Sequence, residues 1–390
     1  MTNPFQRRPN QDGRHTPNLW PVWVVAPGAL LLVALAAYGL YLGAEVLLAT
    51  ESTGKTTKPV PVQDVIKTTV TVLTLTGAVL AALYAYRKQL LDEGTSHRAD
   101  ATQLTERYTK AAEQLGHDQA AVRLAGVYAM ARLADDWPEQ RQVCVDVLCA
   151  YLRMPYETDI NEPGFRHGER EVRLTIIRII RNHLQDPSEP TTWCGRDLDF
   201  TGATFDGGDF SGSTFAGGHV SFSGSTFSGG EVFFSGCTFS GGQVTFKGST
   251  FSGGMIYFAA STFSGGSVFL IDSTFSGGEV FFSGCTFSGG QVTFRLSTLS
   301  GGKIDFGTAL FSGGRILFGG TLFSGGKVSF ARAKFSGSDV SFVRARFSDG
   351  QVTFRNARLS SSRVSFMESR VGVAADIDWG PFPPISVNQP

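Results

Sequence analysis

A twelve-residue repeat fills most of the second half of the chain and constrains its fold more than any other feature. A large apolar residue returns every twelve positions without a break from Phe215 to Val371. Five positions later each unit has Val or Ile, and seven positions later it has Phe or Leu, as in Val220 and Phe222. Residues two apart share a face of a short strand. One unit is too short to enclose a core, so the pattern predicts a solenoid of stacked units.

The repeat also indicates the length of one coil. The position two before each large apolar residue holds only Ser, Ala, Thr or Cys, which indicates a crowded interior, and pairs of glycines supply corners. Residues 231–246 return letter for letter as 279–294, which is 48 positions later. Phe233, Tyr257 and Phe281 recur at a spacing of 24. We therefore predict a four-sided β-helix over residues 196–372, with about seven coils of about 24 residues, followed by a tail at 373–390.

Two uncharged stretches nearer the N-terminus, residues 22–44 and 68–86, are each long enough to cross a bilayer. They predict a transmembrane helical hairpin over residues 20–88, preceded by a disordered segment at 1–19. A cleaved signal peptide is the alternative for the first stretch, but the stretch is too long for one. Basic residues precede the first span (Arg7, Arg8 and Arg14) and follow the second (Arg87, Lys88 and Arg98). This bias predicts a multi-pass protein of the cell membrane with both termini and the β-helix in the cytoplasm.

Between these parts, residues 100–187 have helical periodicity, with candidate helices near residues 107–116, 120–136, 140–153 and 169–184. We expect an all-α connector that joins the hairpin to the solenoid and covers the open end of the first coil. A groove that binds a partner is the alternative role for these helices.

The start of the solenoid has a different period. Phe200, Phe205, Phe210 and Phe215 are five apart, with small residues two before the last three. This stretch resembles the pentapeptide-repeat proteins, and the resemblance implies a right-handed four-sided β-helix. With the hairpin, the connector and the segment WCGRDLDFTGA, the layout is similar to membrane-associated pentapeptide-repeat proteins common in actinobacteria. The resemblance implies an architecture rather than an activity.

No catalytic or metal-binding pattern is present in the sequence. The six histidines are isolated, and the five cysteines do not have the spacing of metal ligands. The sequence therefore predicts no catalytic residue, no metal, no cofactor and no enzymatic activity. The charges balance over the whole chain, so net charge gives no bias toward nucleic acid.

Two sets of outer residues are candidate binding sites. Phe233, Tyr257 and Phe281 form a predicted aromatic column that could bind a protein partner, or could only stack as a ladder. A basic far end could bind an anionic partner, or could simply be solvated and block aggregation. Its candidate residues are Arg332, Lys334, Arg344, Arg346, Arg358 and Arg370.

These observations favour a non-enzymatic, membrane-tethered scaffold for an unknown protein partner, with the lipid bilayer contacted by the two spans. One alternative is an inhibitor that imitates DNA and blocks an enzyme such as gyrase. That alternative needs an acidic surface, whereas residues 196–290 have a net charge of −5 and residues 291–370 a net charge of +8. The other alternative is an anion binder that uses the basic end; nucleic acid is disfavoured, and a homodimer stays open.

Overall fold

The computed structural model describes residues 62–384 together with residues 28, 31, 34, 35, 38, 39 and 42. It divides into two compact units, residues 1–103 and residues 104–390. The expected segment at residues 1–19 and most of the expected span at 22–44 lie outside the described residues.

A long helix, α2 (Val62–Leu115), crosses the boundary between the two units. It includes the expected second span and the first expected connector helix in one continuous element. In the part of the chain that the structure describes, no helix is both long enough and apolar enough to cross a membrane. The stretch at 68–86 contains five threonines, which lower its mean hydropathy. The structure therefore does not support the predicted transmembrane hairpin.

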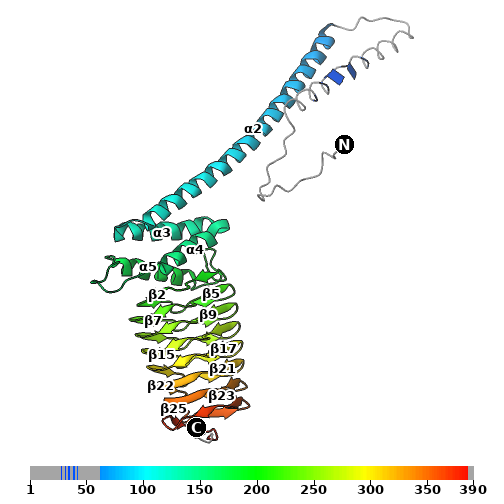
Figure 1. Cartoon of the computed structure of the whole chain (residues 1–390). Helices are drawn as coiled ribbons and strands as arrows, with labels where there is room; N and C mark the ends of the chain where they lie inside the picture. The colour runs from blue at the N-terminus through cyan, green and yellow to red at the C-terminus, as the bar shows by residue number, and fades with distance from the viewer. Residues whose placement is uncertain are drawn as a thin grey trace, which may run out of the picture. The chain divides into compact units, whose positions relative to one another are not determined.

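Three further helices lie between α2 and the solenoid, as expected for the connector. They are α3 (Ala120–Asp136), α4 (Arg141–Arg153) and α5 (Glu169–His183), with a short 3-10 helix η1 (Pro138–Gln140) between α3 and α4. Helix α4 contacts the first strand of the solenoid and α5 contacts the third (Figure 1). Gly208 allows this close approach, because a Cβ there would lie 2.9 Å from Cδ1 of Ile177 on α5.

The solenoid has about eight turns of about 24 residues, with four strands to a turn. Within the described residues all strand pairs are parallel, and most partners are 24 positions apart, such as Phe251 and Phe275. The predicted four-sided coil of about 24 residues is thus confirmed, whereas the number of turns is about eight instead of the expected seven. The first turn is shorter, since Leu198 pairs with Val220, and β29 continues the pairing beyond residue 372.

The four strands of each turn define four faces, which we number in chain order. Face 1 contains β1 (Leu198–Asp199), β5 (His219–Ser221), β9 (Gln243–Thr245), β13 (Ser267–Phe269), β17 (Gln291–Thr293), β21 (Arg315–Leu317), β24 (Asp339–Ser341) and β27 (Arg363–Ser365). Face 2 contains β2 (Thr204–Phe205), β6 (Thr226–Phe227), β10 (Thr250–Phe251), β14 (Thr274–Phe275), β18 (Thr298–Leu299) and β28 (Arg370–Val371).

Face 3 contains β3 (Gly208–Asp209), β7 (Glu231–Phe233), β11 (Met255–Tyr257), β15 (Glu279–Phe281), β19 (Lys303–Asp305) and β29 (Asp376–Asp378). Face 4 contains β4 (Thr214–Phe215), β8 (Thr238–Phe239), β12 (Thr262–Phe263), β16 (Thr286–Phe287), β20 (Leu310–Phe311), β23 (Lys334–Ser336) and β26 (Arg358–Ser360). The longer strands β22 (Leu322–Ser329) and β25 (Arg346–Thr353) run round the corner from face 2 to face 3 and join them in one sheet.

Stacked phenyl rings fill the interior of the solenoid. The rings of Phe234, Phe258 and Phe282 repeat at 4.9 and 4.8 Å, close to the spacing of paired strands. At the far end, Phe382 packs edge-on against Phe354 and Phe366, so the chain folds back under the last turn. Each turn therefore buries its apolar residues against the turns above and below.

The column of small residues has a role beyond fitting a crowded interior. Its hydroxyl groups donate hydrogen bonds to carbonyl oxygens of the preceding turn, as from Ser261 Oγ to Phe234 (2.6 Å) and from Ser249 Oγ to Phe222 (2.6 Å). Ser213 belongs to the first turn, and its buried Oγ has no such partner within the described residues. The Ser, Thr and Cys members of the column therefore tie their turns to the ones before, and Ser213 lacks an acceptor because no turn precedes it.

Candidate interaction surface

Phe233, Tyr257 and Phe281 form one column on face 3, which we call the aromatic strip. Their strands β7, β11 and β15 pair in register, so the three residues are direct neighbours. The rings stack with centroids 5.0 and 5.1 Å apart. The residue before each one points into the core, so the three rings point outward, where they are half-buried. The strip is thus both a ladder of stacked rings and a partly exposed apolar surface.

Phe269, which interrupts the alternation in the sequence, lies on a different side of the solenoid. It belongs to β13 on face 1, where its paired neighbours are Thr245 and Thr293. It therefore does not extend the aromatic strip. With Leu317 two strands further along, it gives face 1 isolated apolar residues instead of a continuous column.

A second outward column runs beside the aromatic strip and consists of Glu231, Met255 and Glu279. The Tyr257 hydroxyl lies 2.7 Å from Sδ of Met255. Partial burial, together with the two carboxylates, raises the pKa of Tyr257. One strand further on, Lys303 places Nζ 5.0 Å from the centroid of the Phe281 ring and 4.0 Å from Oε2 of Glu279. The strip is therefore bordered by negative charge, and a cation covers one end of it.

Two hollows lie on the same side of the solenoid as the aromatic strip. A recess of about 350 Å³ lies beside the contact between α5 and the first turns, and Glu231 and Phe233 belong to its lining. Arg170, Arg178 and Arg181 of α5 line its other side. A shallow groove of about 970 Å³ follows the glycine corner beside face 3, past Glu279, Lys303 and Lys327 to Asp376. Face 3 thus combines apolar side chains, charges of both signs and concave surface.

The residues of the predicted basic far end lie on different faces of the solenoid. Lys334 pairs with Arg358 on face 4, whereas Arg346 pairs with Arg370 on face 2. The last two candidates, Arg332 and Arg344, occupy corners with left-handed backbone angles (φ 59° and 61°). Arg344 also forms an ion pair with Glu368 at 2.7 Å. Residues twelve apart lie half a turn apart, so the equal spacing in the sequence distributes these charges over different faces.

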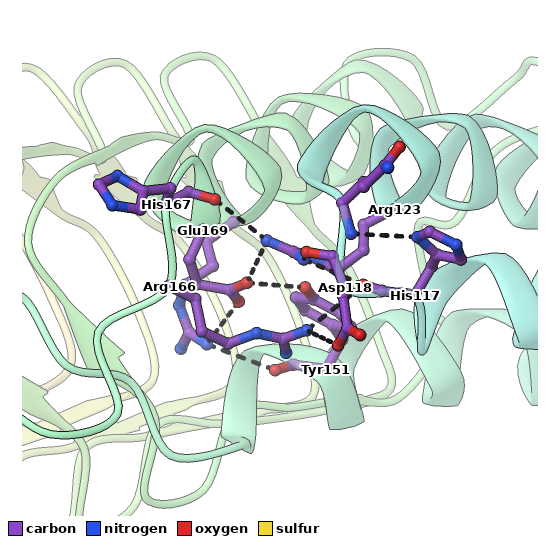
Figure 2. A network of polar contacts seen from close by, with 9 residues as sticks. His117, Asp118, Arg123, Tyr151, Arg166, His167 and Glu169 are labelled. Carbon is purple, nitrogen blue, oxygen red and sulfur yellow. Dashed lines mark hydrogen bonds and ion pairs between the residues drawn. The ribbon is translucent and has the colours of Figure 1, made fainter.

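The connector contains a buried network of charged and polar side chains (Figure 2). Glu169 on α5 accepts a hydrogen bond from the Tyr151 hydroxyl (3.0 Å). It also forms an ion pair with the fully buried Arg123 (3.2 Å). Arg123 also donates to the carbonyl oxygen of His117 (3.0 Å), and Arg173 approaches Glu169 from the same helix (4.0 Å). Burial raises the pKa of Tyr151 to about 12, which keeps its hydroxyl a donor. The carboxylate is held by three helices, so this network serves packing.

The buried cysteines do not provide a reactive group. Sγ of Cys237 and of Cys285 donates to the carbonyl oxygens of Phe210 (3.1 Å) and Phe258 (2.9 Å), as the serines of the same column do. Burial raises the pKa of both thiols to about 12, so they are not thiolates at neutral pH. Among the described residues, no group of three or more His, Cys, Asp or Glu side chains could hold a metal ion.

Comparison with known protein families supports the resemblance noted at the start of the solenoid. The family of pentapeptide repeats (9 copies) matches residues 194–238. No curated protein and no solved structure matches the chain. The chain thus contains pentapeptide repeats over residues 194–238, at the start of its β-solenoid.

Proposed function

We propose that this chain is a non-enzymatic protein-interaction scaffold and that the aromatic strip on face 3 is its main contact surface. The observation that carries the proposal is the strip itself: three stacked, half-exposed rings beside a recess, on a solenoid whose interior is uniform. Aromatic residues beside concave surface are enriched at protein interfaces. The repeat keeps the interior constant and lets outward positions differ, which suits a scaffold.

Crosslinking and affinity capture from the cells that produce the chain would test this proposal. We expect Phe233→Ser, Tyr257→Ser and Phe281→Ser together to reduce capture of a specific protein by about tenfold or more. The matched control is Phe269→Ser with Leu317→Ser, which removes the outward apolar residues of face 1. The proposal fails if the captured proteins are the same for the wild type and the face 3 variant while both remain folded by circular dichroism.

Imitation of DNA is less well supported as a function. A DNA mimic needs an acidic surface along its length, but residues 291–370 have a net charge of +8. Absence of gyrase inhibition by the purified chain in large excess would remove this alternative.

Attachment to a membrane is a separate part of the proposal. Its support is the exposure of large apolar side chains on α2, including Val70 (56%), Leu75 (69%) and Tyr84 (72%), together with the uncharged stretches of the sequence. We expect the full chain to stay in the membrane pellet after washing with alkaline carbonate. Recovery in the supernatant would reject attachment and would leave the scaffold proposal untouched.

A further inference from the structure

The last strands of faces 4 and 1 have no further strand beyond them in the part of the chain that the structure describes. These strands are β26 and β27, which end the sheets of those two faces. The opposite ends of the same sheets are covered. Helix α4 contacts β1, and the backbone N–H of Thr214 on β4 donates a hydrogen bond to the carbonyl oxygen of Leu184 (2.7 Å). We call β26 and β27 the open edge.

The open edge leaves apolar side chains of the repeat uncovered. Leu359 on β26 is 45% exposed, whereas Phe335 and Phe311, at the same position in the two preceding turns, are 1% and 0% exposed. Val364 on β27 is only half-buried, although Val340 in the preceding turn is buried. In earlier turns the next turn covers these columns, so a further strand at the open edge would remove apolar surface from water.

The backbone at the open edge lacks a hydrogen bond that joins earlier turns. In the preceding turn, the N–H of Arg358 donates to the carbonyl oxygen of Ala333 (2.9 Å). Among the described residues, no backbone N–H donates to the equivalent carbonyl oxygen of Ala357. The open edge therefore offers an acceptor to an added strand.

The described tail fills the middle of the last turn but does not add a strand to the open edge. Phe382 packs against the rings of Phe354 and Phe366 in the interior. Prolines occupy positions 381, 383 and 384 around it, and they have no N–H to donate to a neighbouring strand. A strand that covers the open edge must therefore come from outside residues 379–384.

The outward side chains of the open edge are basic. Arg358 lies beside Lys334 on face 4, and neither forms an ion pair with a described residue. On face 1, Arg363 and Arg315 lie on either side of Asp339. Paired strands place their outward residues side by side, so an added strand would set residues directly beside Arg358 and Arg363. Acidic residues there would offset the positive charge, whereas an identical edge would add two more arginines.

We propose that the open edge binds an extended segment of a partner protein, which adds a strand to β26 and β27. The segment runs parallel to them, as the paired strands of the described solenoid do. Its apolar residues cover Leu359 and Val364, and its acidic residues lie beside Arg358 and Arg363. Each arginine directly precedes its apolar neighbour, and the two pairs are five residues apart. The partner segment therefore has two acidic–apolar pairs with the same spacing, and its binding does not depend on the aromatic strip.

A fluorescent peptide with two acidic–apolar pairs at this spacing, joined by serine and glycine, provides a defined probe for the purified full chain. We expect saturable binding by fluorescence anisotropy, and weaker binding of a scrambled peptide of the same composition. Arg358→Glu with Arg363→Glu should weaken binding by about tenfold or more, since two attractive contacts become repulsive. Leu359→Ser should also weaken it. The matched control, Lys247→Glu with Arg295→Glu, reverses two exposed charges elsewhere and should leave binding unchanged.

Several outcomes would overturn this inference, and each leaves the aromatic strip untouched. Equal binding of the scrambled peptide, or unchanged binding by the variant with both arginines reversed, would exclude strand addition at this edge. Light scattering tests for a second copy: a wild-type dimer that Leu359→Asp dissociates would assign the open edge to that copy. If the peptide binds only a chain that ends at Pro384, residues 385–390 occupy the edge in the full chain, and the proposal is wrong.

Discussion

Val268→Asp should destabilise the solenoid by more than about 4 kcal/mol, enough to lower the midpoint of thermal unfolding by on the order of 10 °C. Val268 is only 4% exposed and pairs with Val244 and Val292 in the neighbouring turns. A carboxylate there would be removed from solvent between two valines, so no charged or hydrogen-bonding partner on the paired strands would offset its desolvation. Since each turn is stabilised by its neighbours, the loss spreads along the stack.

The matched control for this substitution is Ser267→Asp, which places the same charge one residue earlier. Ser267 belongs to the same strand and points outward. Its substitution should change the free energy of unfolding by less than about 0.5 kcal/mol. Both variants can be compared with the wild type by urea or thermal unfolding followed by circular dichroism. Equal stabilities would show that Val268 does not point into the core.

Gly266→Ala should be the second strongly destabilising change, by about 1–3 kcal/mol more than Gly284→Ala. Both glycines have left-handed backbone angles, φ 60° and 69°, so each alanine incurs about 1–2 kcal/mol of conformational strain. At Gly266 a Cβ would also lie 2.5 Å from the carbonyl oxygen of Gly242 in the preceding turn. At Gly284 nothing lies within 4 Å of that position.

The comparison of these two variants isolates the contact between turns from the backbone strain that they share. Chemical denaturation of both proteins under the same conditions gives the difference directly. If the two alanine variants lose the same stability, the glycine corner is needed only for its backbone angle. A larger loss for Gly266→Ala supports the account in which paired glycines let successive turns approach.

The sequence was sufficient to predict the solenoid because its signal is periodic and local. The spacing of Phe233, Tyr257 and Phe281 predicted the coil length and placed these rings in one column, as found. The same spacing, applied to Lys334 and Arg346, would have separated them, since residues twelve apart lie half a turn apart. The sequence analysis placed these residues at one end of the solenoid and did not assign them to faces.

Other features depend on contacts that the repeat does not encode. The recess beside Phe233 exists because α5 packs on the first turns, and its arginines come from outside the solenoid. The ion pair between Arg123 and Glu169 joins residues 46 positions apart in different helices. The sequence predicts that Ser261 is small and buried. Its hydrogen bond to the carbonyl oxygen of Phe234 depends on how two turns are aligned in space, which the repeat pattern does not give. Sequence periodicity predicts such a column but not what its atoms bind.

Hydroxyl-radical footprinting of the full chain, with and without a captured partner, tests the central claim most directly because aromatic and methionine side chains report on their own exposure. The account predicts that oxidation of Phe233, Met255, Tyr257 and Phe281 falls several-fold in the complex, while that of Phe269 and Leu317 on face 1 does not change. Protection of face 1 with unchanged oxidation of face 3 would contradict the assignment of the aromatic strip as the binding surface.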